Sequence, residues 1–272
     1  MFTDASTPKS ADGTGESYEP ASGLKVRFLL TFDDGPHHCT SRVLQTLAVN
    51  SVQDEIKAVF FVQTRHPEGG GSAAGRVILK QEHQEGHVLG LHTGTATGHI
   101  SHTSLSRMEL ERSLENGKKD LAAIMHRSPL LVRPPYWRYN ARSLECYGRH
   151  DLHMLLSDVK AYDGINWGAH VFRRWNFRSQ LNRVRNESRH VARRDREETR
   201  PVVVTFHDTN AYTADNLAEY LSLLIDEAER LGLPLHTKPF FDQPSDVLDG
   251  ALQCAVHNPV PTFHSGMCVT TG

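Results

Sequence analysis

Strand-length apolar runs alternate with segments of helical spacing along most of this 272-residue chain. Helical spacing extends over 178–198 and 214–232. Another helix is indicated by a capping box formed by Ser106 and Glu109, after which apolar residues again recur at helical spacing. Between such segments, seven runs have the composition of buried strands: 25–32, 57–63, 87–91, 130–133, 152–156, 201–206 and 234–237. Because βα units place strands parallel, the sequence predicts an α/β fold in a single domain. We expect a (β/α) barrel of about seven parallel strands, closed or nearly closed.

The two ends of the chain lack this alternation. Residues 1–23 are rich in Ser, Thr, Gly and Ala, and they have neither the basic start nor the apolar stretch of a signal peptide. We therefore expect a flexible leader over 1–23, a barrel over 24–239, and a tail over 240–272 that packs on the barrel. No apolar run approaches the ~20 residues that a membrane-spanning helix needs, so no membrane span is expected.

Composition narrows the kinds of site that this chain can build. The formal net charge is −2, which gives no case for a nucleic-acid partner. Histidine is abundant, with 17 residues against four cysteines. The cysteines form no CxxC pair, and the sequence leaves their disulfide pairing and the oligomeric state open. A metal site in this chain is therefore expected to use imidazole and carboxylate ligands rather than thiolates.

Polar clusters follow the predicted strands at the points where the strands end. The first is Asp33-Asp34, and the others are His92-Thr93, Arg133–Trp137, the Asp158–Asp163 region and His207-Asp208. In a parallel barrel these ends lie on one face, where active sites form. Two adjacent carboxylates repel each other, and a cation relieves that repulsion if one of them binds it while the other acts as a base. The sequence thus predicts a metal-centred active site.

These clusters, in this order, resemble the five motifs of the polysaccharide deacetylase family, also called the NodB-homology domain or carbohydrate esterase family 4. The resemblance covers roughly residues 25–237. It implies a distorted (β/α) barrel and a divalent metal, zinc or another such as cobalt. It also implies hydrolysis of N-acetyl groups on a peptidoglycan-like or chitin-like polysaccharide, with release of acetate. Such a substrate implies a secreted, periplasmic or cell-wall location. The alternatives are an amide hydrolase for a small non-sugar substrate and a non-catalytic glycan-binding relative.

The resemblance also assigns roles to residues of the first, third and fifth motifs. Asp33 would be the general base, oriented and kept ionised by Arg133. The developing oxyanion would be held by the metal and by the backbone N–H of Tyr136. His207 would be the general acid that protonates the leaving amine. The expected substrate contacts are Tyr136, Trp137 and, near the acetyl methyl group, Thr205.

The second motif departs from the family pattern. The family binds its metal through the second Asp of the first motif and two histidines four residues apart, which gives Asp34 and His92 here, but position 96 is Ala. Counting back from the predicted helix start at Leu105-Ser106 selects His99 as the third ligand. That choice implies three additional residues between the two histidines, in a loop rich in Gly and Thr. His102 is the competing choice.

The fourth motif departs as well. The family has two aspartates three apart, and here the candidates are Asp158 and Asp163. Either one would raise the pKa of His207 so that the imidazole starts protonated. Asp158 lies closer to the end of its strand, so we expect it to be the catalytic partner.

Overall fold

A computed structural model describes residues 24–163, 171–191 and 199–256 of the chain. The predicted leader (1–23) and the end of the predicted tail (257–272) lie outside the described residues. The strands are β1 Val26–Asp33, β2 Val59–Gln63, β3 Val88–Thr93, β4 Leu131–Val132, β5 His153–Met154, β6 Val159–Lys160, β7 Arg200–His207 and β8 Leu235–Phe240. All of their pairings are parallel, in the order β5-β4-β3-β2-β1-β7-β6, and β8 also pairs with β1.

The predicted α/β fold with about seven parallel strands is confirmed, although the sheet is a partial barrel. Within the described residues, β5 and β6 end the order and do not pair with each other. Each of the seven predicted runs contains or overlaps a strand. The additional strand, β6, has only two residues, too few to show a periodic pattern. The curved sheet remains open at this point.

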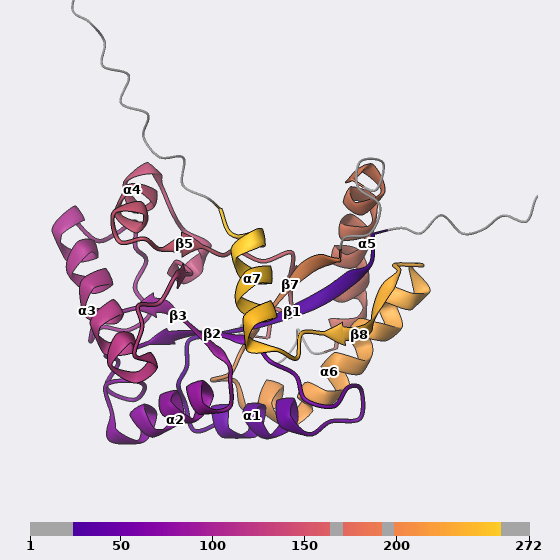
Figure 1. Ribbon diagram of the computed structural model, residues 1–272, viewed down its shortest axis with the longest axis horizontal. Helices are drawn as coiled ribbons and strands as arrows, with labels where there is room; N and C mark the ends of the chain where they lie inside the picture. The colour runs from indigo at the N-terminus through magenta and orange to yellow at the C-terminus, as the bar shows by residue number, and fades with distance from the viewer. Residues whose placement is uncertain (1–23, 164–170, 192–198, 257–272) are drawn as a thin grey trace, which may run out of the picture.

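Helices cover the outside of the sheet, and one helix lies across its other face (Figure 1). The seven α-helices of the described residues are α1 Thr40–Ala48, α2 Ala73–Gln84, α3 Arg107–Met125, α4 Ala141–Arg149, α5 Arg173–Val191, α6 Ala211–Arg230 and α7 Pro244–Cys254, and a 3₁₀ helix spans Pro135–Trp137. Few periodic cues in the sequence indicated α7, because this helix is short and begins at a proline. No helix in the described part of the chain is both long and apolar enough to span a bilayer.

The alternation of side chains along β1 explains where the core and the cleft lie. All eight residues of β1 are buried, as expected for a parallel strand covered on both faces. Phe28 and Phe32 belong to the larger apolar cluster, which packs under the outer helices. Leu29 belongs to a smaller cluster that α7 covers. Thr31 and Asp33 continue on the Leu29 side of the strand, so this side becomes polar toward the carboxyl end.

Candidate active site

A cleft of about 730 Å³ lies at the carboxyl ends of the strands. The polar clusters predicted from the sequence supply most of its lining: Asp33, Asp34, His92, His99, Tyr136, Trp137, Thr205 and His207. Two predicted site residues are absent from the cleft lining: Arg133, which lies buried below it, and Asp158. The strand ends have therefore gathered residues that are far apart in the sequence, such as Asp33 of β1 and His207 of β7, which lie opposite each other in the sheet.

Asp34, His92 and His99 form a compact group of metal-ligating atoms. One ligand atom from each lies within 4.8 Å of the other two. Oδ1 of Asp34 lies 3.3 Å from Nε2 of His92 and 3.5 Å from Nε2 of His99. Burial raises the pKa of Asp34, but the neighbouring His92 and His99 outweigh it and hold this pKa far below its usual range.

The hydrogen bonds of His92 indicate that this group fits a divalent metal. Nδ1 of His92 lies 2.8 Å from the carbonyl oxygen of Arg133, so it is Nδ1 that carries the proton. Nε2 therefore presents a lone pair, and it is buried without a hydrogen-bond partner while facing the Asp34 carboxylate. Two acceptors this close repel unless a cation lies between them. One carboxylate and two imidazoles form a donor set that suits zinc.

The loop between the two histidines explains how His99 reaches this group. Gly94 passes so close to α3 that a Cβ atom would lie 2.1 Å from the carbonyl oxygen of Ser113. Gly98 has a φ of +74°, in the left-handed region that glycine adopts without strain. The ring of Tyr136 then stacks on His99, with centroids 4.3 Å apart. The inserted loop thus returns a histidine to Asp34 and His92, as the count from the helix start predicted.

His102, the competing choice, lies beside the group but is not part of it. Its ring is fully buried, and Nδ1 lies 2.6 Å from the hydroxyl of Tyr147. Burial and the neighbouring His92 lower the pKa of His102 to about 3, so the imidazole is neutral. His102 thus packs behind the loop that carries His99.

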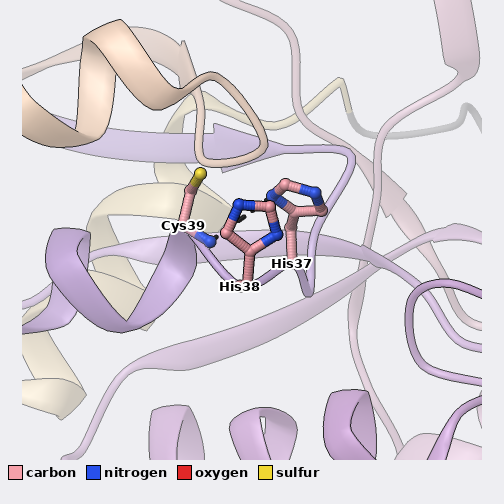
Figure 2. Close-up of side chains that lie close together, drawn as sticks. All are labelled: His37, His38 and Cys39. Carbon is pink, nitrogen blue, oxygen red and sulfur yellow. Dashed lines mark hydrogen bonds between the residues drawn. The ribbon is translucent and has the colours of Figure 1, made fainter.

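A second set of potential ligands, His37, His38 and Cys39, lies in the turn between β1 and α1 (Figure 2). The two imidazole rings lie against each other, with centroids 3.8 Å apart, and the Cys39 thiol is fully buried. None of the three lines the cleft. Cys39, Cys146 and Cys254 are free thiols, and Cys268 lies outside the described residues. A metal bound at this turn would lie outside the cleft that the sequence motifs form.

Arg133 fills the interior of the partial barrel directly below the cleft. It is fully buried, and its guanidinium donates to Asp33 Oδ1 at 2.8 Å and to Thr31 Oγ1 at 2.7 Å. Its remaining donors reach the carbonyl oxygens of Leu155 and Leu156. Each of the three guanidinium nitrogens therefore donates a hydrogen bond. These bonds fix the guanidinium and, through it, the carboxylate of Asp33. The predicted pairing of Arg133 with Asp33 is present in the structure.

His207 pairs with Asp163, so the preference for Asp158 was wrong. Nδ1 of His207 lies 2.8 Å from Asp163 Oδ1, and Asp163 Oδ2 accepts from the His207 backbone N–H at 2.8 Å. Asp158 instead accepts from the backbone N–H of Val203, outside the cleft. The chain leaves β6 after Lys160 and brings Asp163, not Asp158, over the end of β7.

The environment of His207 keeps its imidazole protonated. Burial alone would lower its pKa, but the hydrogen bond and charge of Asp163, together with Asp33 and Asp34, raise the pKa to about 10. Asp163 is itself fixed by the hydroxyl of Thr213, which donates to Oδ2 at 2.7 Å. A partly buried cation lining the cleft is thus available as a proton donor.

The third motif forms the wall of the cleft. Tyr136 and Trp137 have positive φ values of 58° and 61°, a strained conformation for such residues that functional sites often contain. Trp137 lies under the guanidinium of Arg133 and the ammonium of Lys160. Lys160 and Arg138 also line the cleft, and our reading of the sequence overlooked both. The cue available for Lys160 was its place three residues before Asp163.

Comparisons with known proteins agree with this arrangement. The polysaccharide deacetylase family model matches residues 23–155. The chain is 29% identical to a chitin deacetylase of Pestalotiopsis over 136 residues, which are 50% of this chain and 43% of that one. It is 34% identical to a peptidoglycan-N-acetylglucosamine deacetylase of Bacillus cereus over 112 residues, 41% of this chain and 36% of that one. These matches span less than half the length of either curated relative.

The fold similarity extends over most of the chain. The structure of the chitin deacetylase from Colletotrichum lindemuthianum aligns with a TM-score of 0.60 and 18% identity, covering 90% of this chain and 97% of that one. The fold and the ordered motifs define a carbohydrate-esterase-type partial barrel. These matches show that the chain is similar to the polysaccharide deacetylase family, whose model covers slightly less than half of it.

Proposed function

We propose that this chain is a metal-dependent hydrolase that removes N-acetyl groups from a peptidoglycan-like or chitin-like polysaccharide and releases acetate. One observation carries this proposal: the neighbouring carboxylates Asp33 and Asp34 have opposite partners. Asp33 pairs with a guanidinium, whereas Asp34 faces two imidazoles. One carboxylate is thus fixed by an arginine, as suits a base, and the other is offered to a cation. A passive glycan-binding site has no use for this division.

Asp34, His92 and His99 would hold the metal. A divalent ion bound there supplies Lewis-acid chemistry, which makes water a better nucleophile near neutral pH and polarises the acetyl carbonyl. The choice between zinc and another divalent ion such as cobalt belongs to this proposal. His99 is partly exposed, with 33% of its side chain accessible, so the open side of the group faces the cleft. Substrate would approach from that side.

Asp33 would act as the general base. The Arg133 guanidinium fixes the Asp33 carboxylate and compensates its charge, while the second carboxylate oxygen is left to accept a proton. The attacking water gives this proton to Asp33 as its oxygen forms a bond to the acetyl carbon. The backbone N–H of Tyr136 would donate to the oxygen that becomes negative in this step.

His207 would act as the general acid. Nδ1 faces Asp163, so Nε2 is the ring nitrogen left to deliver a proton to the cleft. Breakage of the carbon–nitrogen bond leaves the sugar amine, which takes this proton, and the acetyl group departs as acetate. Trp137 and Thr205 would contact the substrate, the ring face of Trp137 offering an apolar surface to a pyranose. A cell-wall substrate would place the protein outside the cytoplasm, secreted, periplasmic or attached to the wall.

Metal content measured together with acetate release tests this proposal. Purified protein is analysed for bound zinc and cobalt and then incubated with N-acetylglucosamine oligomers and peptidoglycan fragments. The same measurements are made on His99→Ala and on His38→Ala, a matched histidine from the turn outside the cleft. We expect one bound metal and acetate release, both lost in His99→Ala and both retained in His38→Ala.

Each alternative outcome has a definite meaning. Metal loss in His38→Ala but not in His99→Ala would move the metal to the His37–Cys39 turn and contradict the proposed centre. Bound metal without acetate release from any glycan would contradict the polysaccharide substrate and favour a different amide. A protein that binds no metal and releases no acetate would contradict the enzymatic proposal itself.

A further inference from the structure

Two cationic side chains line the cleft without an acidic partner. Lys160 and Arg138 are both part of the cleft lining. Among the described residues, neither makes a side-chain ion pair or side-chain hydrogen bond, and their contacts are with aromatic rings. The ammonium of Lys160 lies 4.1 Å from the centre of the Trp137 ring, and the guanidinium of Arg138 lies 6.0 Å from that of Tyr136. Their charges are therefore available to a ligand.

The backbone around Lys160 is held firmly enough to aim this side chain. Its N–H donates to the side chain of Gln180 at 2.9 Å. Its carbonyl oxygen accepts from the side chains of Gln180 and Asn176, both on α5. A two-residue strand would otherwise be a weak support. Because α5 anchors β6 from outside the sheet, the ammonium stays on the cleft side, over Trp137.

The other charges of the cleft are already compensated. Asp33 pairs with Arg133, and His207 pairs with Asp163. Asp34 faces the two histidines at the candidate metal centre. What remains is an excess of positive charge on Lys160 and Arg138, in a chain whose formal net charge is −2. This excess is therefore a local feature of the cleft.

The environment of Lys160 favours binding of an anion there. Partial burial lowers the pKa of Lys160, and the nearby Arg133 lowers it further. Both effects mean that the ammonium has lost hydration and is repelled by a neighbouring cation. A carboxylate placed beside it would relieve both at once through a charge-assisted hydrogen bond. The Trp137 ring below it would pack against the apolar face of the sugar that carries this carboxylate.

We propose that Lys160, assisted by Arg138, forms a carboxylate subsite, and that the substrate is an N-acetylated saccharide bearing a carboxylate near the acetamido group. This inference rests on the proposed function, because it assumes that the cleft binds a glycan. It selects anionic glycans over neutral chitin-like ones. The carboxylate is either a lactyl ether substituent, as in muramic acid, or the acid group of a uronic acid.

A matched ligand pair tests the subsite through binding, independently of hydrolysis. The pair is a tetrasaccharide of alternating N-acetylglucosamine and N-acetylmuramic acid and the same compound with its lactyl carboxyl groups reduced to alcohols. Affinities are measured by calorimetry on the metal-loaded protein, and acetate is quantified in the same samples. A uronate-containing N-acetylated tetrasaccharide forms a further arm that separates the two sources of carboxylate.

We expect wild type to bind a carboxylated ligand about tenfold more tightly than the reduced one, the effect of one partly exposed charge-assisted hydrogen bond. In Lys160→Met this ratio should fall close to one, and Lys160→Arg should restore most of it. Arg138→Met, an exposed position, should lower the ratio partly. Lys80→Met removes an exposed lysine of α2 outside the cleft and should leave the ratio unchanged.

The results separate this inference from the function beneath it. Equal affinities of wild type for the carboxylated and reduced ligands, or a preference that persists in Lys160→Met, would overturn the subsite even if acetate is released. A preference that depends on Lys160, in samples that release no acetate, would support the subsite and contradict the proposed hydrolysis.

Discussion

Buried charged groups near the cleft fall into two sets with opposite surroundings. The paired set lies on the cleft side and consists of Asp33 with Arg133 and Asp163 with His207. The unpaired set lies behind it and consists of Glu82 on α2 and Asp208 directly after β7. Both carboxylate oxygens of Glu82 and Oδ1 of Asp208 are buried without a partner within the described residues.

The difference shows that partners, not burial alone, decide which groups stay charged. Burial alone would lower the pKa of His207, but the neighbouring Asp163 raises it to about 10. Burial raises the pKa of Asp208 to about 7, and the hydroxyl of Thr40 offsets this only in part. Burial also raises the pKa of Glu82 well above its usual range, and the nearby Asp208 adds to the shift. Asp163 thus favours the charged form of His207, while burial favours the protonated forms of Glu82 and Asp208.

Breaking the His207 pair should have the largest effect. In Asp163→Asn the carboxylate that raises the pKa of His207 is gone, so the imidazole loses its proton at lower pH. Since the protonated imidazole is the proposed acid, acetate release should fall about 10³-fold near neutral pH. Its alkaline limb should also move to lower pH, because activity is lost as pH rises through this pKa. The pH profile of kcat/KM and the histidine NMR signal measure both effects.

Asp158→Asn is the matched control for this prediction. It makes the same chemical change in the fourth motif, at a position outside the cleft. We expect acetate release within about twofold of wild type and an unchanged pH profile, since Asn retains an oxygen that accepts from Val203. Loss of activity in Asp158→Asn with little loss in Asp163→Asn would reverse the assignment of the partner.

Breaking the other pair should lower activity, because Arg133 orients the proposed base, and should lower stability as well. Arg133→Met leaves Asp33 buried without its guanidinium and leaves two backbone carbonyl oxygens without their donor. The free energy of unfolding should fall by about 3–5 kcal/mol, as for other broken buried ion pairs. Urea denaturation measures this fall. Arg149→Met removes an exposed arginine that also pairs with carboxylates, and should cost less than about 1 kcal/mol.

The same comparison explains how much the sequence could predict. The alternating pattern located the strands, and the strand ends then placed Asp33, Arg133 and His207 at one cleft. These are consequences of local periodicity and of the rule that parallel strands end at the same edge of a sheet. The identity of the Asp partner depended on the path of the chain after a two-residue strand, which has no periodic signal. The burial of Glu82 depends on how α2 packs against the rest of the fold. The sequence shows only a glutamate within a helix, and it does not show that this carboxylate is buried without a partner.

Removing the unpaired carboxyl group of Glu82 should have the smallest effect and the opposite sign. The folded protein retains the Glu82 proton to higher pH than the unfolded chain does, because the folded pKa is raised. The stability of wild type therefore falls as pH rises above the unfolded value of about 4.3 and through the folded pKa. Glu82→Met removes this linkage and should stabilise the protein by about 1–3 kcal/mol at pH 7 and by less at pH 4.

Urea denaturation at both pH values measures the difference, with the exposed Glu115→Gln as the control. A Glu82→Met variant less stable than wild type at pH 7 would mean that this carboxyl group has a partner after all, and the contrast between the two sets would then fail.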